Sequence, residues 1–200
     1  MRALRVGRTL AAVVAVIGIL GGVAAGAKAP DPVAARKKWK AGIGVNGGFM
    51  LPSEKDLKAD TFLGGQVSYW PSELKAVSVT WGSCNLVDEA NTGTLKVSPV
   101  LISAVLSLPA NSKGGVESSF RWLLGFGAGF LVMDHTDVSI KPGSIPVLAF
   151  HGGGETVLGG GVGRVYFDVD ITKADIVKIN AVDRDLSLMT TLKVGIEILF

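Results

Sequence analysis

The chain alternates large apolar residues with small or polar ones over long stretches, with a period of two. In segment 39–51, odd positions carry mostly tryptophan, isoleucine, valine, phenylalanine and leucine, whereas even positions carry mainly lysine, glycine and asparagine. Successive side chains of a β-strand point to opposite faces, so this pattern predicts a strand with one apolar face. The segment is also much longer than the common strand length of about 5–6 residues.

Seven more segments repeat the pattern, which predicts eight strands in all. The strands are 39–51, 59–70, 74–85, 94–108, 116–132, 147–158, 162–171 and 186–200. The connections alternate in length along the chain. The short ones are 71–73, 109–114 and 159–160, and the longer polar ones are 52–58, 86–93, 134–146 and 172–185. An even number of amphipathic strands, joined by short turns at one end and longer loops at the other, is typical of an outer-membrane β-barrel.

The predicted fold class is therefore all-β: an eight-stranded antiparallel up-and-down transmembrane barrel. Lipid offers no hydrogen-bond partners, so a sheet that spans a bilayer must close on itself. Apolar side chains then face out and polar ones face the lumen. We expect Trp39, Tyr69, Trp70 and Phe200 to form an aromatic girdle at the short-turn interface. The alternative is a soluble β-sandwich with one wet face, which the long strands and the nearly charge-free face disfavour.

The first 27 residues predict an export signal. Three arginines precede the apolar segment 9–20, and small residues up to Ala27 fit a cleavage site. The alternative is a membrane anchor, because the apolar stretch approaches the length of a spanning helix. We predict three parts: a signal peptide over 1–27, a periplasmic lead-in over 28–38 and the barrel over 39–200.

Removal of that leader changes the charge balance. Lys plus Arg falls from 20 to 20 − 3 = 17, which equals the 17 Asp plus Glu. A neutral mature chain predicts no nucleic-acid partner. Cys84 is the only cysteine, so no intrachain disulfide can form. Two histidines and one cysteine give no metal-ligand spacing, and we expect neither a metal nor a cofactor.

The last eight residues, KVGIEILF, contain a spaced motif. Lys193, Gly195, Ile198 and Phe200 follow the order polar, any, Gly, any, any, hydrophobic, any, aromatic. This motif resembles the C-terminal recognition signal of outer-membrane barrels. The resemblance implies that the barrel-assembly machinery is a partner and that it recognises the last strand.

The mature chain also resembles the eight-stranded outer-membrane β-barrel superfamily, near the outer-membrane protein W type. The Gly-rich segments 122–134 and 149–170 carry this similarity. It implies a monomer surrounded by outer-membrane lipids in a Gram-negative cell envelope. It further implies passive, porin-like passage of small, mainly hydrophobic molecules as ligands. The alternative is a structural or adhesive barrel without transport, which would act through its extracellular loops.

The turn at 159–160 allows a strand register to be predicted. A two-residue hairpin loop places Glu155 opposite Arg164 and His151 opposite Asp168. Antiparallel pairing of the last two strands would add Glu197 beside Arg164 and Lys193 beside Asp168. We predict one lumenal polar network, whose members are Glu117, Arg121, His151, Glu155, Arg164, Asp168, Lys193 and Glu197. Its role is either structural filling of the lumen or a gate or ligand site.

An enzymatic role is not expected. The lipid A deacylase family resembles this architecture, but it needs a serine two residues after its histidine, and position 153 is glycine here. His135 falls in a predicted loop without a nucleophile beside it. We therefore predict that the barrel is not an enzyme.

Overall fold

The computed structural model describes residues 41–72, 74–88, 93–110, 120–135, 143–158, 162–174, 176–179, 182–185 and 188–200. The predicted signal peptide, the lead-in, Trp39 and Glu117 lie outside these residues. The predicted division of the chain into three parts therefore stays a prediction.

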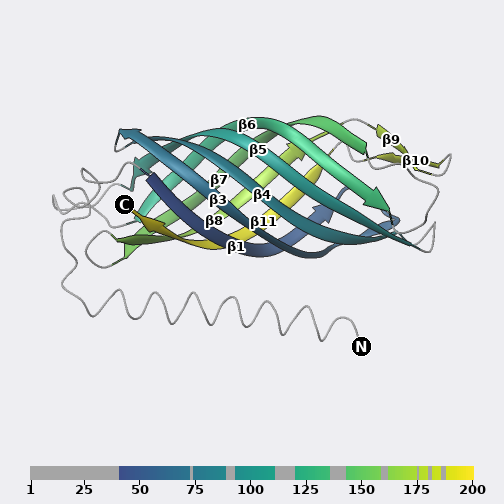
Figure 1. The fold of residues 1–200 in the computed structure, drawn as a ribbon, viewed down its shortest axis with the longest axis horizontal. Helices are drawn as coiled ribbons and strands as arrows, with labels where there is room; N and C mark the ends of the chain where they lie inside the picture. Colours follow the sequence, from purple (N-terminus) through teal and green to yellow (C-terminus); the bar gives the residue numbers. More distant parts are fainter. Residues whose placement is uncertain are drawn as a thin grey trace.

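Eight long antiparallel strands form one closed barrel (Figure 1). They are β1 (Ala41–Pro52), β3 (Asp60–Ser72), β4 (Lys75–Asp88), β5 (Gly93–Pro109), β6 (Phe120–His135), β7 (Gly143–Leu158), β8 (Gly163–Lys173) and β11 (Met189–Leu199). Each pairs with its neighbours along the chain, and β1 pairs with β11 to close the sheet. The predicted fold class is confirmed, and each of the eight predicted segments contains one of these strands. Residues 39–40, 116–119 and 186–187 of those segments lie outside the described residues.

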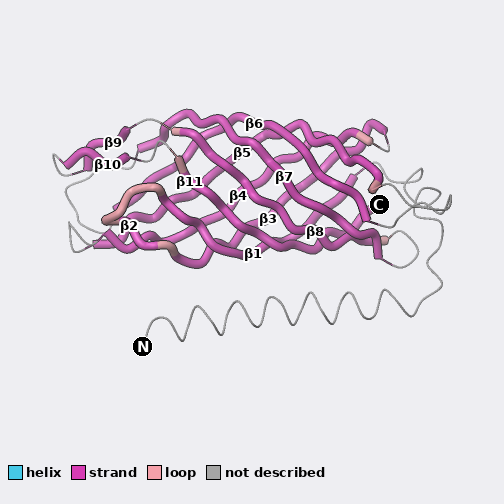
Figure 2. The backbone as a smooth tube through the Cα atoms, turned by 180° about the vertical axis from the view of Figure 1, so that it is seen from behind, coloured by secondary structure: helices cyan, strands magenta, loops and turns pink. Residues whose placement is uncertain are grey.

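Two short additions fall in segments predicted as loops. Strand β2 (Leu57–Lys58) pairs with the end of β4, and β9 (Ile176–Ile179) pairs with β10 (Val182–Asp185) as a separate hairpin. Figures 1 and 2 show this hairpin at the end of the barrel opposite the C-terminus. We call that end, where β4 stops at Asp88 and β8 at Lys173, the loop end. The other end, where β3 meets β4 and β11 stops, is the turn end.

The outer wall of the barrel is apolar. On β6, four outward side chains, those of Trp122, Leu124, Phe126 and Phe130, are each more than 50% exposed. Large exposed apolar side chains repeat in this way on every long strand. Such a band is costly in water and is what a lipid-facing wall requires. Among the described residues, no helix is long and apolar enough to cross a membrane.

The predicted aromatic girdle is only partly correct. Tyr69 and Phe200 are exposed on the outer wall near the turn end. Trp70 is wrong as a girdle residue, because it is 4% exposed and points into the lumen. Neighbouring strand residues face opposite sides, so Tyr69 and Trp70 cannot both face lipid.

The lumen is not polar throughout, which corrects the predicted polar interior. Its loop-end half holds a hydrophobic core of buried inward side chains, including Met50, Phe62, Leu86, Leu95, Val97, Leu131, Met133 and Met189. These side chains come from strand ends next to the longer connections. An apolar filling has no hydrogen bonds to satisfy, so it can occupy a dry lumen without partners.

Phe62 illustrates how the side chains of this core pack together. A Cβ atom built on Gly82 of the adjacent strand would overlap the Phe62 ring. The missing side chain at Gly82 therefore leaves the space that the ring fills. When a large side chain is removed from an interior packed in this way, the protein loses the free energy gained by transferring that side chain out of water, and it loses the contacts around the cavity.

We predict that Phe62→Ala lowers the free energy of unfolding by about 3–5 kcal/mol, because it leaves a cavity. Leu63→Ala on the outer wall is the matched control and should cost only about 1–2 kcal/mol, because lipid replaces the lost atoms. Urea unfolding of the refolded barrel in lipid vesicles measures both values. Equal losses would contradict a packed lumen.

Candidate functional site in the barrel lumen

Polar side chains fill the turn-end half of the lumen. They alternate with the outward apolar residues on all eight long strands, so strand geometry alone directs each of them to the interior. The buried members are Asn46, Gln66, Ser68, Ser78, Thr80, Ser103, Ser107, Arg121, His151, Glu155, Arg164, Asp170, Lys193 and Glu197. Buried charges are costly unless paired, so their contacts determine what the site can do.

Arg164 joins two buried carboxylates. Its Nη1 donates to Glu155 and its Nε donates to Glu197. Both glutamate side chains are fully buried. Charge-assisted pairs of this kind are strong in a dry interior, but each member depends on the other.

Neighbouring strands complete the coordination of these carboxylates. Glu197 also accepts hydrogen bonds from Gln66 Nε2, at 3.2 Å, and from Ser68 Oγ. Glu155 accepts one from Ser107 Oγ at 2.7 Å. The cluster therefore ties β3, β5, β7, β8 and β11 together across the lumen.

Two aromatic rings flank the Arg164 guanidinium. Its Cζ lies 4.9 Å from the centroid of Trp70 and 5.2 Å from that of Tyr166. Trp70 is held by donating its Nε1 hydrogen to Ser68 Oγ at 3.0 Å. Arg164 is thus fixed by cation–π contacts as well as by its carboxylates, which explains why Trp70 faces inward.

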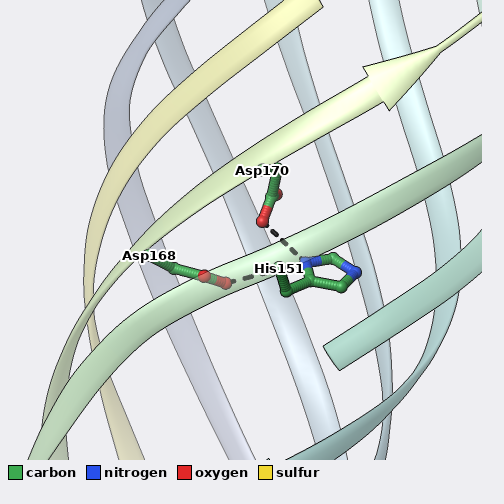
Figure 3. Close-up of side chains that lie close together, drawn as sticks. All are labelled: His151, Asp168 and Asp170. Atoms are coloured by element: carbon green, nitrogen blue, oxygen red, sulfur yellow. Dashed lines mark hydrogen bonds and ion pairs between the residues drawn. The ribbon is translucent and has the colours of Figure 1, made fainter. Parts of the chain in front are cut away.

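A second cluster lies next to the first. Lys193 Nζ is 2.6 Å from Asp170 Oδ2 and 3.3 Å from Asp168 Oδ2. His151 Nδ1 is 2.6 Å from Asp170 Oδ1 and 3.7 Å from Asp168 Oδ2, and Figure 3 shows both carboxylates directed at the imidazole. The other ring nitrogen, Nε2, is 2.6 Å from Ser103 Oγ.

The strand register decides which of these pairs face each other. The predicted pairing of β8 with β11 is confirmed, since Arg164 faces Glu197 and Asp168 faces Lys193. The predicted pairing of β7 with β8 is wrong by two residues. His151 faces Asp170, and Glu155 faces Tyr166.

The cause is the turn between these strands. Leu158 pairs with Gly163, so the connection is longer than the predicted two-residue loop at 159–160. Those two glycines lie outside the described residues. A shift of two residues keeps every side chain on its face, so the inward set survives. Arg164 still reaches Glu155, now diagonally rather than directly across the pair.

The remaining predicted members are placed differently. Arg121 is 3% exposed and lies opposite Glu155 in the β6–β7 register. Among the described residues, its Nη1 has no hydrogen-bond partner. Glu117 lies outside the described residues, so its membership stays a prediction.

Asp170 and Ser103 belong to the network although they were not predicted to do so. Asp170 shares the inward face of its strand with Arg164 and Asp168, and that alternation was the signal that could have found it. Ser103 has no comparable signal, because its strand is nearly apolar on both faces.

Ser103, His151 and Asp170 follow the hydrogen-bond order of a nucleophilic triad. However, the adjoining cavity, which is lined by His151, Tyr166 and Lys193, has a volume of only about 20 Å³. That is room for about one water molecule. Ser103 is also paired in the sheet on both sides, with Ser78 and with Gly127, so its backbone lies within the ladder.

The histidine and the two aspartates also have the composition of a metal site. One ligand atom from each of His151, Asp168 and Asp170 lies within 4.8 Å of the others. Lys193 Nζ contacts both carboxylates and supplies a positive charge at that place. The described geometry is thus that of a salt-bridge cluster whose cation is part of the chain.

The residues of the C-terminal motif divide between the two faces of β11. Lys193 points inward to the aspartates, whereas Ile198 and Phe200 are exposed on the outer wall. At Gly195, an added Cβ would overlap the Tyr166 ring. Tyr166 in turn accepts a hydrogen bond from Asn46 Nδ2 at 3.1 Å. Gly195 therefore has a packing role, and recognition of the motif stays a prediction.

Comparison with known proteins gives the fold. No protein-family model matches the chain, and no curated protein sequence matches it. Solved structures do match. Neisserial surface protein A has a TM-score of 0.60 and 12% identity over 80% of this chain and 97% of its own.

Two structures from Pseudomonas aeruginosa are also similar. The N-terminal β-barrel domain of OprF has a TM-score of 0.53 and 8% identity, covering 82% of this chain and 100% of its own. The outer membrane protein OprG has a TM-score of 0.52 and 16% identity, covering 81% and 97%. The chain therefore has the eight-stranded outer-membrane β-barrel fold.

We predict that Arg164→Met destabilises the barrel by about 3–5 kcal/mol, because Glu155 and Glu197 lose their charged donor. The triple variant Arg164→Met, Glu155→Gln, Glu197→Gln should recover most of this loss. Urea unfolding in vesicles compares the two. A triple variant no more stable than the single one would show that the charges do not control this part of the lumen.

We also predict that Gly195→Val destabilises the barrel by overlap with Tyr166, by about 1–3 kcal/mol or more. In a Tyr166→Ala background the same substitution should cost little. Gly47→Val is the matched control on β1, because an added Cβ there makes only ordinary contacts, with the Leu63 side chain and the Phe62 carbonyl oxygen. Refolding in detergent, without assembly machinery, isolates the packing effect. Equal costs in both backgrounds would contradict the contact.

Proposed function

We propose that the chain is an integral barrel of the bacterial outer membrane with a closed lumen, and that it acts without passing solutes through that lumen. One observation carries this proposal: side chains fill the interior at both levels. The loop-end half is a hydrophobic core, and the turn-end half is the salt-bridge network.

The width of the barrel supports closure. An interior of eight strands is about wide enough for its own side chains. The cavity beside the network has a volume of about 20 Å³, which is close to that needed for one water molecule. A solute crossing the lumen would have to separate Arg164 from its two carboxylates and then displace packed residues such as Phe62. Both steps are costly.

Of the two roles expected from the sequence, the structural or adhesive one fits this geometry better than passage of small hydrophobic molecules. The working surfaces would then be outside the lumen. They are the outer wall and the loop end, where the β9–β10 hairpin extends from the barrel (Figure 2). The same closure supports a non-enzymatic role, because a substrate would need space beside Ser103.

Assembly is the second part of the proposal. We propose that β11 is the strand read by the barrel-assembly machinery. Support comes from the outward position of Ile198 and Phe200, which leaves both side chains accessible on the wall. Lys193 and Gly195 serve the lumen instead, so the polar and glycine positions of the motif have structural reasons of their own.

Solute uptake tests the closed lumen. The refolded mature barrel is placed in liposomes, and entry of one small polar dye and one apolar dye is measured, with an open porin as the positive control. Heat-sensitive gel mobility first checks that the refolded sheet has closed into a barrel. We expect entry of both dyes at the rate of protein-free liposomes. Faster entry of the apolar dye alone would overturn the proposal in favour of hydrophobic passage.

A further inference from the structure

The outer wall carries a groove at its loop-end side. Its volume is about 610 Å³, within the range of ligand-binding clefts. It crosses the outer faces of β5, β6 and β7 and reaches the end of β8. Residues that line it include Ile102, Ala128, Phe130, Pro146, Leu148 and Lys173.

Two features of the sheet create this groove. Ile102, Ala128, Leu148 and Lys173 are successive cross-strand neighbours, and alanine is the smallest side chain in that row. Furthermore, β8 ends at Lys173, whereas β7 continues past Leu148 to Gly143. The outer wall is therefore recessed at Ala128, and β7 has no strand beside it beyond the end of β8.

Among the described residues that line the groove, Lys173 is the one that carries a charge. It is exposed on the outer wall, and it makes no ion pair with another side chain in the described parts of the chain. A lone ammonium on a lipid-facing wall is unfavourable unless it lies near the headgroups or meets an anion. Lys173, as the last residue of β8, stands at the loop end, where headgroups would lie.

We propose that this groove binds a lipid whose phosphate headgroup has a net negative charge, with an acyl chain over Ala128 and the phosphate at the Lys173 ammonium. The apolar lining matches an acyl chain, and the single cation matches an anionic headgroup. This inference rests on the proposed membrane location, but not on the state of the lumen.

Native mass spectrometry of the refolded mature barrel tests the proposal. The barrel in detergent is titrated with diphosphoryl lipid A, and separately with phosphatidylcholine and with inorganic phosphate. We expect lipid A to bind more tightly than phosphatidylcholine, and inorganic phosphate alone not to bind. Lys173→Gln should weaken lipid A binding about fivefold, as expected for one cation near a membrane surface. Lys173→Arg should retain it, and Ala128→Phe should reduce binding of both lipids by filling the groove.

Two matched controls make the result specific. Lys96→Gln removes another exposed lysine near the loop end, and Ala104→Phe adds bulk elsewhere on the outer wall. Neither should change lipid binding. Equal losses in Lys96→Gln and Lys173→Gln, or unchanged binding in Ala128→Phe, would overturn the groove. Heat-sensitive gel mobility is measured on every variant to check that the sheet has closed into a barrel. A folded barrel without lipid preference would refute the lipid-binding groove, but it would not bear on the proposal that the lumen is closed to solutes.

Discussion

A strand in lipid can satisfy its backbone only by pairing with another strand, and this constraint governs the whole molecule. The sheet must have no free edge, so the first and last long strands must meet. They do so along β1 and β11, where Ala41 and Phe200 exchange backbone hydrogen bonds of 3.1 and 3.0 Å. Closure with eight long strands then sets the width of the lumen. Everything inside has to fit that width.

The lumen is filled by two different physical means. The loop-end core requires only complementary shape, and the Phe62 ring in the space left by Gly82 is an example. The turn-end network needs partners as well as shape, because a buried charge without a partner costs several kcal/mol, of the order of 3–5. Arg164 meets that requirement for Glu155 and Glu197 together. Tyr166 combines packing with hydrogen bonding, since its ring packs on Gly195 while its hydroxyl accepts a hydrogen bond from Asn46.

The sequence predicts the strands well because a period of two is a local property. It predicts the network members less well, because membership depends on register, and register depends on a turn. The pairing of β8 with β11 is correct, whereas that of β7 with β8 is shifted by two residues. The inward face survived this error, but Asp170 took the place opposite His151. The hydrophobic core escaped prediction for another reason: alternation cannot tell which apolar face is outside when both faces are apolar.

An interior filled by packing and ion pairs is the reason why we propose that recognition takes place on the outside of the barrel. The exposed positions of interest there are those that break the apolar pattern of the wall. Lys173 is such a position, because a cation on a lipid-facing wall is costly unless water, headgroups or an anion lie nearby. Ala128 breaks the pattern in the opposite sense, as a small residue two positions from Phe126 and from Phe130 on the outward face of β6. The two exceptions meet in one groove, which makes the outer wall rather than the lumen the more informative surface of this barrel.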